Sequence, residues 1–139
     1  MADMHHLVQV DGADPAAAYT ALTTREGITS WWTSRAEVAG DRLSMSFPDA
    51  PMTWDMRVTA AERPTTLEWD CTGGPPGWAG TRLRWGVEPT DGGAVVRFDH
   101  TGFPDVDDMF RVVTVGWAQM LLSLKAHLET GARKPFFDF

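Results

Sequence analysis

The sequence predicts an α+β domain in which a curved antiparallel sheet is covered by a long C-terminal helix. Between residues 35 and 101, apolar and polar residues alternate with a period of two, which is typical of antiparallel strands with one buried face. Residues 106–130 instead repeat apolar side chains at helical spacing. A sheet with one apolar face needs a cover, and this helix can supply it.

A strand and two short helices are expected before the sheet proper. Residues 4–10 alternate as a strand. Asp14 suits the N-cap of a helix and Pro15 suits its first position, in an alanine-rich segment that favours helix. A second short helix is expected to begin near Thr24, although Gly27 weakens it.

Six further strands follow from the alternating pattern, with turns between them. They cover residues 35–39, 42–47, 52–60, 65–72, 81–88 and 94–101. The inward faces of these strands are mostly large and apolar: Met45, Phe47, Trp54, Met56, Leu67, Trp69, Leu83, Trp85, Phe98 and His100.

The long helix has clear signals at both ends. Acidic residues at 105, 107 and 108 suit its start, where the helix dipole favours negative charge, and Gly131 fits the position after its last turn. Its inward stripe is expected to hold Met109, Val113, Gly116, Trp117, Met120, Leu124 and Leu128.

Length and composition exclude several classes of protein. The 139 residues fit one domain, residues 1–139, and the net charge of −7 disfavours nucleic acids and anionic membranes as partners. No apolar run is long enough to cross a membrane, and the first residues do not have the pattern of a secretory signal. A single cysteine, Cys71, excludes an internal disulfide, so the expected compartment is the cytoplasm.

The order of elements and the local sequence together resemble a known superfamily. The residues that carry the resemblance are Ala13-Asp14-Pro15, Ala18 to Thr23, Ile28, Trp31-Trp32, Phe98, His100-Thr101-Gly102, Gly116-Trp117 and Leu121 to Gly131. They are similar to the SRPBCC (START-like) superfamily, in the branch related to the activator of the Hsp90 ATPase. This resemblance implies the helix-grip fold, also known from START domains and the birch pollen allergen, with a cavity between the sheet and the C-terminal helix. The superfamily includes lipid carriers, polyketide cyclases, hormone-binding proteins and chaperone-binding domains.

Seven tryptophans make the interior unusual, because they could either line such a cavity or fill it. An empty cavity of about 300 Å³ would cost about 7 kcal/mol, comparable to the net stability of a domain. If the cavity is open, the expected ligand is a small, mainly hydrophobic or aromatic molecule. The expected ligand-binding residues are Trp32, Trp54, Trp69, Trp85, Phe98, Trp117 and Met120, with His100 as a polar handle.

His100 has two interpretations that the sequence leaves open. It is either a core histidine bonded to a neighbour, or a group that fixes a ligand or acts as a general base. No metal site is expected, because His5 and His6 face opposite sides of a strand and no metal-ligand spacing occurs. No cofactor is expected either.

Two segments outside the regular elements also have two interpretations. Residues 72–80 form either a long hairpin loop or a flap that places Trp78 over the mouth of a cavity. The C-terminal residues 134–139 contain three phenylalanines, which must pack on the body of the protein or in a homodimer. We expect them to dock on the body.

Three functions are therefore compatible with the sequence. The first is binding of a small hydrophobic molecule. The second is an enzyme of the polyketide cyclase or hydrolase type that uses His100, although the strand pattern places the charged residues outside. The third is a protein-interaction domain with a chaperone partner, and a homodimer also stays open.

Overall fold

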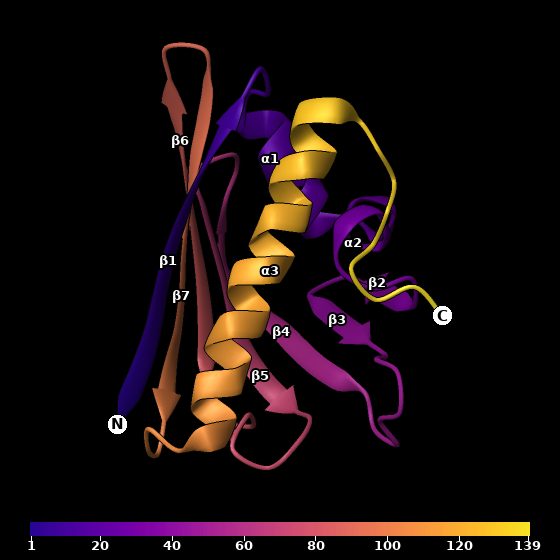
Figure 1. The fold of residues 1–139 in the computed structure, drawn as a ribbon, viewed down its shortest axis with the longest axis vertical. Helices are drawn as coiled ribbons and strands as arrows, with labels where there is room; N and C mark the ends of the chain where they lie inside the picture. Colours follow the sequence, from indigo (N-terminus) through magenta and orange to yellow (C-terminus); the bar gives the residue numbers. More distant parts are fainter.

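The computed structural model describes residues 1–139 and has the expected α+β helix-grip fold (Figure 1). Seven antiparallel strands form one sheet in the order β1-β7-β6-β5-β4-β3-β2. The elements are β1 (Ala2–Asp11), α1 (Pro15–Thr23), α2 (Arg25–Trp31), β2 (Ala36–Ala39), β3 (Arg42–Met45), β4 (Trp54–Glu62), β5 (Thr66–Gly73), β6 (Arg82–Thr90), β7 (Gly93–Phe103) and α3 (Asp108–Thr130).

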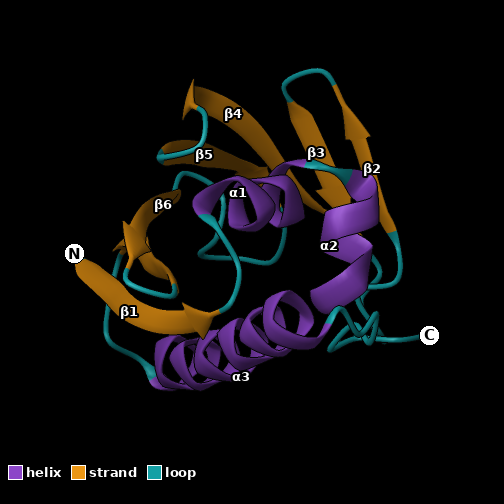
Figure 2. Ribbon diagram, turned by 90° about the horizontal axis from the view of Figure 1, so that it is seen from above, coloured by secondary structure: helices purple, strands orange, loops and turns teal.

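The sheet curves around the helices. Seen from above in Figure 2, the strands form an arc, α1 lies within it, and α3 closes its open side with α2 beside it. The core lies between the concave face of the sheet and these three helices. None of the helices is both long enough and apolar enough to cross a membrane.

The predicted starts of the two short helices are confirmed. The Asp14 carboxylate accepts a hydrogen bond from the backbone N–H of residue 17 (2.8 Å), and the Thr24 hydroxyl accepts one from Gly27 (2.9 Å). Gly27 has a packing role that outweighs its low helix propensity. A Cβ at this position would lie 2.6 Å from both the Cα of Ala21 and the carbonyl oxygen of Thr20, so only glycine lets α1 and α2 approach this closely.

The ends of α3 also follow the prediction, but its first turn does not. Asp107 caps the helix by accepting a hydrogen bond from the N–H of Phe110 (2.8 Å), and Gly131 ends it with a left-handed backbone (φ 77°). The expectation that Met109 faces inward is wrong, because its side chain is 57% exposed. Phe110 takes the inward place instead and packs edge-on against Phe103, with ring centroids 5.4 Å apart.

The predicted strand faces are confirmed in the centre of the sheet, where Leu67, Trp69, Cys71, Leu83, Trp85 and Val87 are all buried. The strand predicted at 52–60 begins two residues later, and Met52 lies in the preceding loop, 39% exposed. A bulge at Thr59 shifts the register between Val58 and Ala60, so that Ala61 pairs with Leu67.

The C-terminal segment docks on the body of the protein, as expected. In Figure 1 it runs from the end of α3 back across α2 towards β2 and β3. The backbone N–H groups of Phe136 and Phe137 donate to the carbonyl oxygens of Trp31 (2.9 Å) and Trp32 (2.8 Å). The carbonyl of Phe137 in turn accepts from the N–H of Ser34 (2.8 Å), which pairs the segment with the chain after α2.

Candidate functional site

A tightly packed set of tryptophan rings fills the centre of the core. Trp32 stacks on Trp69 with centroids 6.3 Å apart and an angle of 7° between the rings, and it lies 5.0 Å from Trp117. Phe98 lies 4.3 Å from Trp85 and 4.2 Å from Trp117. All five side chains are at most 1% exposed, so the space between α3 and the central strands is closed by aromatic rings.

His100 lies at one end of this aromatic core and is completely buried. The indole N–H of Trp117 donates to its Nδ1 (3.1 Å), and because an indole can only donate, the imidazole proton belongs on Nε2. Nε2 then donates to the Thr81 hydroxyl (2.8 Å), which donates to the carbonyl oxygen of Trp78 (2.6 Å). Burial lowers the pKa of His100 from 6.5 to about 3. His100 is therefore neutral, and both of its ring nitrogens are occupied by neighbours within the protein.

The first opening in the core, which we call the α3 cavity, lies between α3 and the chain around β3 and β4. Its volume is about 260 Å³, and eight of its nine lining residues are hydrophobic. They are Trp32, Phe47, Trp54, Trp78, Val112, Val113, Gly116, Met120 and Phe137. Val112 is 67% exposed, so the cavity opens to solvent along α3.

One wall of the α3 cavity is aromatic and the other is aliphatic. Phe47 contacts Trp54 edge-on, with centroids 4.6 Å apart, and also contacts Phe137 of the C-terminal segment (5.1 Å). Trp78, from the loop after β5, closes the row at 6.0 Å from Trp54. The indole N–H of Trp32 is buried and has no hydrogen-bond partner. Through these contacts, Trp78 holds the loop after β5 against the body of the protein, and Phe137 does the same for the C-terminal segment.

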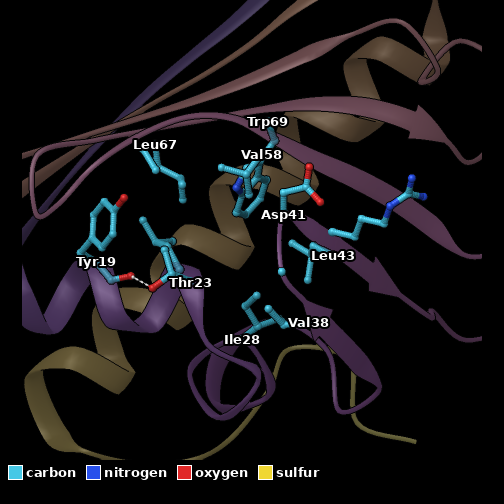
Figure 3. A pocket seen from close by; sticks show the side chains of 13 residues that line it. Tyr19, Thr23, Ile28, Val38, Asp41, Leu43, Val58, Leu67 and Trp69 are labelled. Carbon is cyan, nitrogen blue, oxygen red and sulfur yellow. Dashed lines mark hydrogen bonds between the residues drawn. The ribbon is translucent and has the colours of Figure 1, made fainter.

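The second opening, which we call the α1 cavity, lies between α1 and the strands β2 to β5 (Figure 3). Its volume is about 380 Å³. Its thirteen lining residues are Tyr19, Leu22, Thr23, Ile28, Val38, Gly40, Asp41, Arg42, Leu43, Val58, Ala61, Leu67 and Trp69. The two cavities share no lining residue. Trp32 lines the α3 cavity, and Trp69, on which it stacks, lines the α1 cavity.

The structure divides the eight sequence-predicted ligand-binding residues into three groups. Trp32, Trp54 and Met120 line the α3 cavity, and Trp69 lines the α1 cavity. The other four, Trp85, Phe98, His100 and Trp117, lie in the packed interior and line neither cavity, because their rings fill the space between sheet and helix. That the eight residues bind a ligand stays a prediction.

The structure also brings to the α3 cavity three residues that were not among the eight predicted ligand-binding residues. Phe47 was expected on the inward face of its strand, Trp78 in a candidate flap, and Phe137 in a docking tail. The sequence thus predicted the local position of each residue on its own. Their meeting in one wall depends on a parallel bridge between Thr33 and Phe137, which periodicity does not reveal.

Acid–base and metal chemistry have little support near the α3 cavity, since none of its nine lining residues is acidic or basic. Ion pairs lie on the other face of the sheet, where Arg82 contacts Asp70 (3.0 Å) and Arg84 contacts Glu68 (3.4 Å). No group of three or more His, Cys, Asp or Glu side chains is placed to hold a metal ion.

Comparison with known proteins places this geometry in a family. The family model described as "Activator of Hsp90 ATPase homolog 1-like protein" matches residues 12–129. The chain is similar to the Aha1 dimer from Colwellia psychrerythraea, with 31% identity and a TM-score of 0.85, over 94% of this chain and 98% of that one. No similar sequence is found among the curated proteins.

Two more distant structures share the fold. Protein SSP2350 from Staphylococcus saprophyticus is 20% identical, with a TM-score of 0.76 over 96% of both chains. DynU16, a protein of the dynemicin biosynthetic locus, is 19% identical, with a TM-score of 0.77 over 99% of this chain and 51% of its own.

Proposed function

The chain belongs to the family of activator of Hsp90 ATPase homolog 1-like proteins, and this family name alone assigns no chemistry to it. We propose that it binds a small, mainly hydrophobic molecule in the α3 cavity. The observation that carries the proposal is the cavity itself: about 260 Å³, open to solvent, and lined almost entirely by apolar side chains. Water in such a space finds few hydrogen-bond partners, so an apolar molecule that displaces it gains free energy.

The shape of the wall favours a flat, aromatic ligand. The edges and faces of Phe47, Trp54 and Trp78 are already arranged at right angles to one another, which is the arrangement that aromatic rings prefer. On the opposite side, Met120 can adapt to ligands of different outline because its side chain is flexible and polarizable.

Gly116 offers a direct test of the proposal. It lines the α3 cavity one helical turn from Val112 and from Met120, and a Cβ added to it meets no atom within 4 Å. Gly116→Leu therefore places a side chain in the cavity without a clash, whereas Gly116→Ala adds only one methyl group and serves as the matched control. Both substitutions also raise helix propensity, so neither is expected to prevent folding.

The experiment titrates the three proteins with N-phenyl-1-naphthylamine, a neutral apolar dye whose fluorescence rises on binding, and then displaces it with fatty acids and flat aromatic compounds. We expect saturable binding to the wild type and to Gly116→Ala, and an affinity at least tenfold lower for Gly116→Leu. At a hundredfold excess over Kd, a ligand should raise Tm by about 8 °C. Equal dye binding by all three proteins, or none by the wild type, would contradict the proposal.

An enzymatic function has less support than binding. His100 is neutral, and its ring nitrogens are both engaged, so it has no free lone pair for a substrate proton. His100 does not line the α3 cavity, and none of the residues that do has an acidic or basic side chain. We therefore propose binding without a chemical step.

Self-association is a second candidate, favoured by the dimeric state of the relative from Colwellia psychrerythraea. The outward face of α3 carries Val112, Val115 and Leu122, each more than half exposed. We propose that a homodimer forms through this face, since an apolar stripe of this kind is typical of an interface. Sedimentation of Val115→Lys tests it: the wild type should sediment as a dimer and the variant as a monomer, while a monomeric wild type would refute the dimer.

A chaperone partner and a cytoplasmic location are the remaining proposals. The family name supports the first, and a pulldown with an Hsp90-type chaperone would test it. The second rests on the single cysteine, Cys71, which is free and has no second cysteine with which to form an internal disulfide.

A further inference from the structure

The α1 cavity lies apart from the site proposed above and has its own walls. It is bounded by α1, α2, the β2–β3 hairpin and the inner faces of β4 and β5, whereas the α3 cavity is bounded by α3, two loops and the C-terminal segment. The stacked rings of Trp32 and Trp69 lie between them and are each at most 1% exposed. Occupation of one cavity therefore does not require occupation of the other.

The deep part of the α1 cavity is apolar and preformed. Leu22, Ile28, Leu43, Leu67 and Trp69 line it, and each is at most 4% exposed. Figure 3 shows the side chains of Ile28, Leu43, Leu67 and Trp69 converging from α2, β3 and β5 on a common space. A cavity of about 380 Å³ with such a lining is of the size and character that binds small organic molecules.

Tyr19 brings a neutral hydroxyl without a protein partner to this lining. Tyr19 is 3% exposed as a residue, and its hydroxyl, which solvent can still reach, makes no hydrogen bond to the rest of the protein. In Figure 3 the ring of Tyr19 stands at one end of the cavity, with its hydroxyl on the side of Leu67. Thr23, the other residue of the lining with a hydroxyl, already donates to the carbonyl oxygen of Tyr19 (2.8 Å).

The protonation state of Tyr19 suits a neutral hydrogen bond. Burial raises the pKa of its hydroxyl, an effect only partly opposed by the guanidinium of Arg63, which lies 4.8 Å from the ring centroid. The group is therefore protonated at neutral pH and can both donate and accept.

The rim of the cavity does not favour a charged ligand. Asp41 and Arg42 are its only charged lining residues, they carry opposite charges, and both are exposed. Since a cation and an anion would each meet one repulsive neighbour, charge gives neither an advantage. A neutral molecule with an apolar ring system and one hydroxyl matches both the deep wall and Tyr19.

We propose that the α1 cavity is a second binding site, which takes a small neutral aromatic alcohol or phenol whose hydroxyl pairs with that of Tyr19. The rings lie against Trp69 and the leucines of the deep wall, and the hydroxyl points to α1. This site does not depend on binding in the α3 cavity.

The test compares two probes that differ by one hydroxyl, 2-naphthol and naphthalene, on isotope-labelled protein by NMR. We expect nuclear Overhauser contacts from 2-naphthol to the methyl groups of Leu43 and Val58, both of which line the α1 cavity and not the α3 cavity. Tyr19→Phe should weaken 2-naphthol binding at this site about three- to tenfold, as expected for one lost hydrogen bond. It should change naphthalene binding less than twofold.

Two blocking variants separate this proposal from the one made for the α3 cavity. Ala61 lines the α1 cavity from an exposed position on β4, so Ala61→Phe should block it while suiting the strand. Gly116→Leu should leave the 2-naphthol contacts to Leu43 unchanged. The proposal is overturned if 2-naphthol contacts only Val113 and Met120, if Ala61→Phe binds it at this site like the wild type, or if Tyr19→Phe weakens both probes equally.

Discussion

Acid should destabilise this protein through His100, and the size of the effect follows from its burial. The folded pKa is lowered to about 3 by desolvation, against 6.5 for an ordinary histidine, so the unfolded chain binds the proton more readily. The stability gained by keeping His100 neutral is fully present above pH 6.5 and is lost as the pH falls towards 3. Linkage between these two pKa values gives a loss of about 2 kcal/mol between pH 7 and pH 5.

The measurement is urea unfolding, followed by tryptophan fluorescence at pH 7, 6 and 5, for the wild type and His100→Gln. The variant should be less stable at pH 7, because the hydrogen bonds of the imidazole to Trp117 and Thr81 are disturbed, but its stability should fall by about 2 kcal/mol less on acidification. In thermal melts the same difference corresponds to about 6 °C. His6, whose pKa is lowered by burial and by His5, is present in both proteins, so its contribution cancels.

A surface variant provides the control. His5→Gln also removes one histidine, but from a side chain that is 67% exposed, and it should reduce the acid-induced loss far less than His100→Gln does, because it relieves only the smaller influence of His5 on the pKa of His6. If the wild type and His100→Gln lose equal stability between pH 7 and pH 5, His100 is not the buried neutral group described here, and the assignment of its proton to Nε2 loses its basis.

Three further substitutions test the packing around the site, each by urea unfolding. Thr81→Val should cost about 1–3 kcal/mol, because it leaves the Nε2–H of His100 without an acceptor; an unchanged stability would argue against that hydrogen bond. Gly27→Ala should cost about 3 kcal/mol, since its methyl group would meet the backbone of Ala21 at 2.6 Å, and a gain in stability would show that α1 and α2 can separate. Phe137→Ala should cost about 3 kcal/mol and weaken dye binding in the α3 cavity, and dye binding at wild-type strength would remove the tail from its wall.

Much of the fold could be predicted from the sequence, because its strands have one solvent-exposed and one buried face. The alternation at Leu67, Trp69 and Cys71 places all three inward, and the structure agrees. The N-cap at Asp14 and the C-terminal glycine of α3 are local signals that tertiary contacts do not override.

Errors arise where a local pattern competes with packing. Met109 fits the helical stripe, but Phe110 fills the inward place in the first turn of α3 because Phe103 lies there to receive it. The bulge at Thr59 leaves no mark on the alternating pattern before it, yet it brings Ala61 to the α1 cavity.

The site was harder to predict than the fold, because a tryptophan that fills a core and one that lines a cavity have the same sequence signal. Trp85 and Trp117 are inward on their elements, as expected, but the ring of Phe98 lies within 4.3 Å of Trp85 and closes the space. Trp54 is also inward and remains at a cavity. Only the distances between rings distinguish the two cases.

A structure of the protein crystallised with N-phenyl-1-naphthylamine tests the central claim most directly, namely that the α3 cavity is a ligand site. We expect density for the dye between Gly116 and Met120 on one side and Trp54 on the other, with the rings of Trp85 and Trp117 unmoved. Saturating dye found only on the outer face of α3, or an α3 cavity that stays without dye while the dye binds elsewhere, would contradict the account.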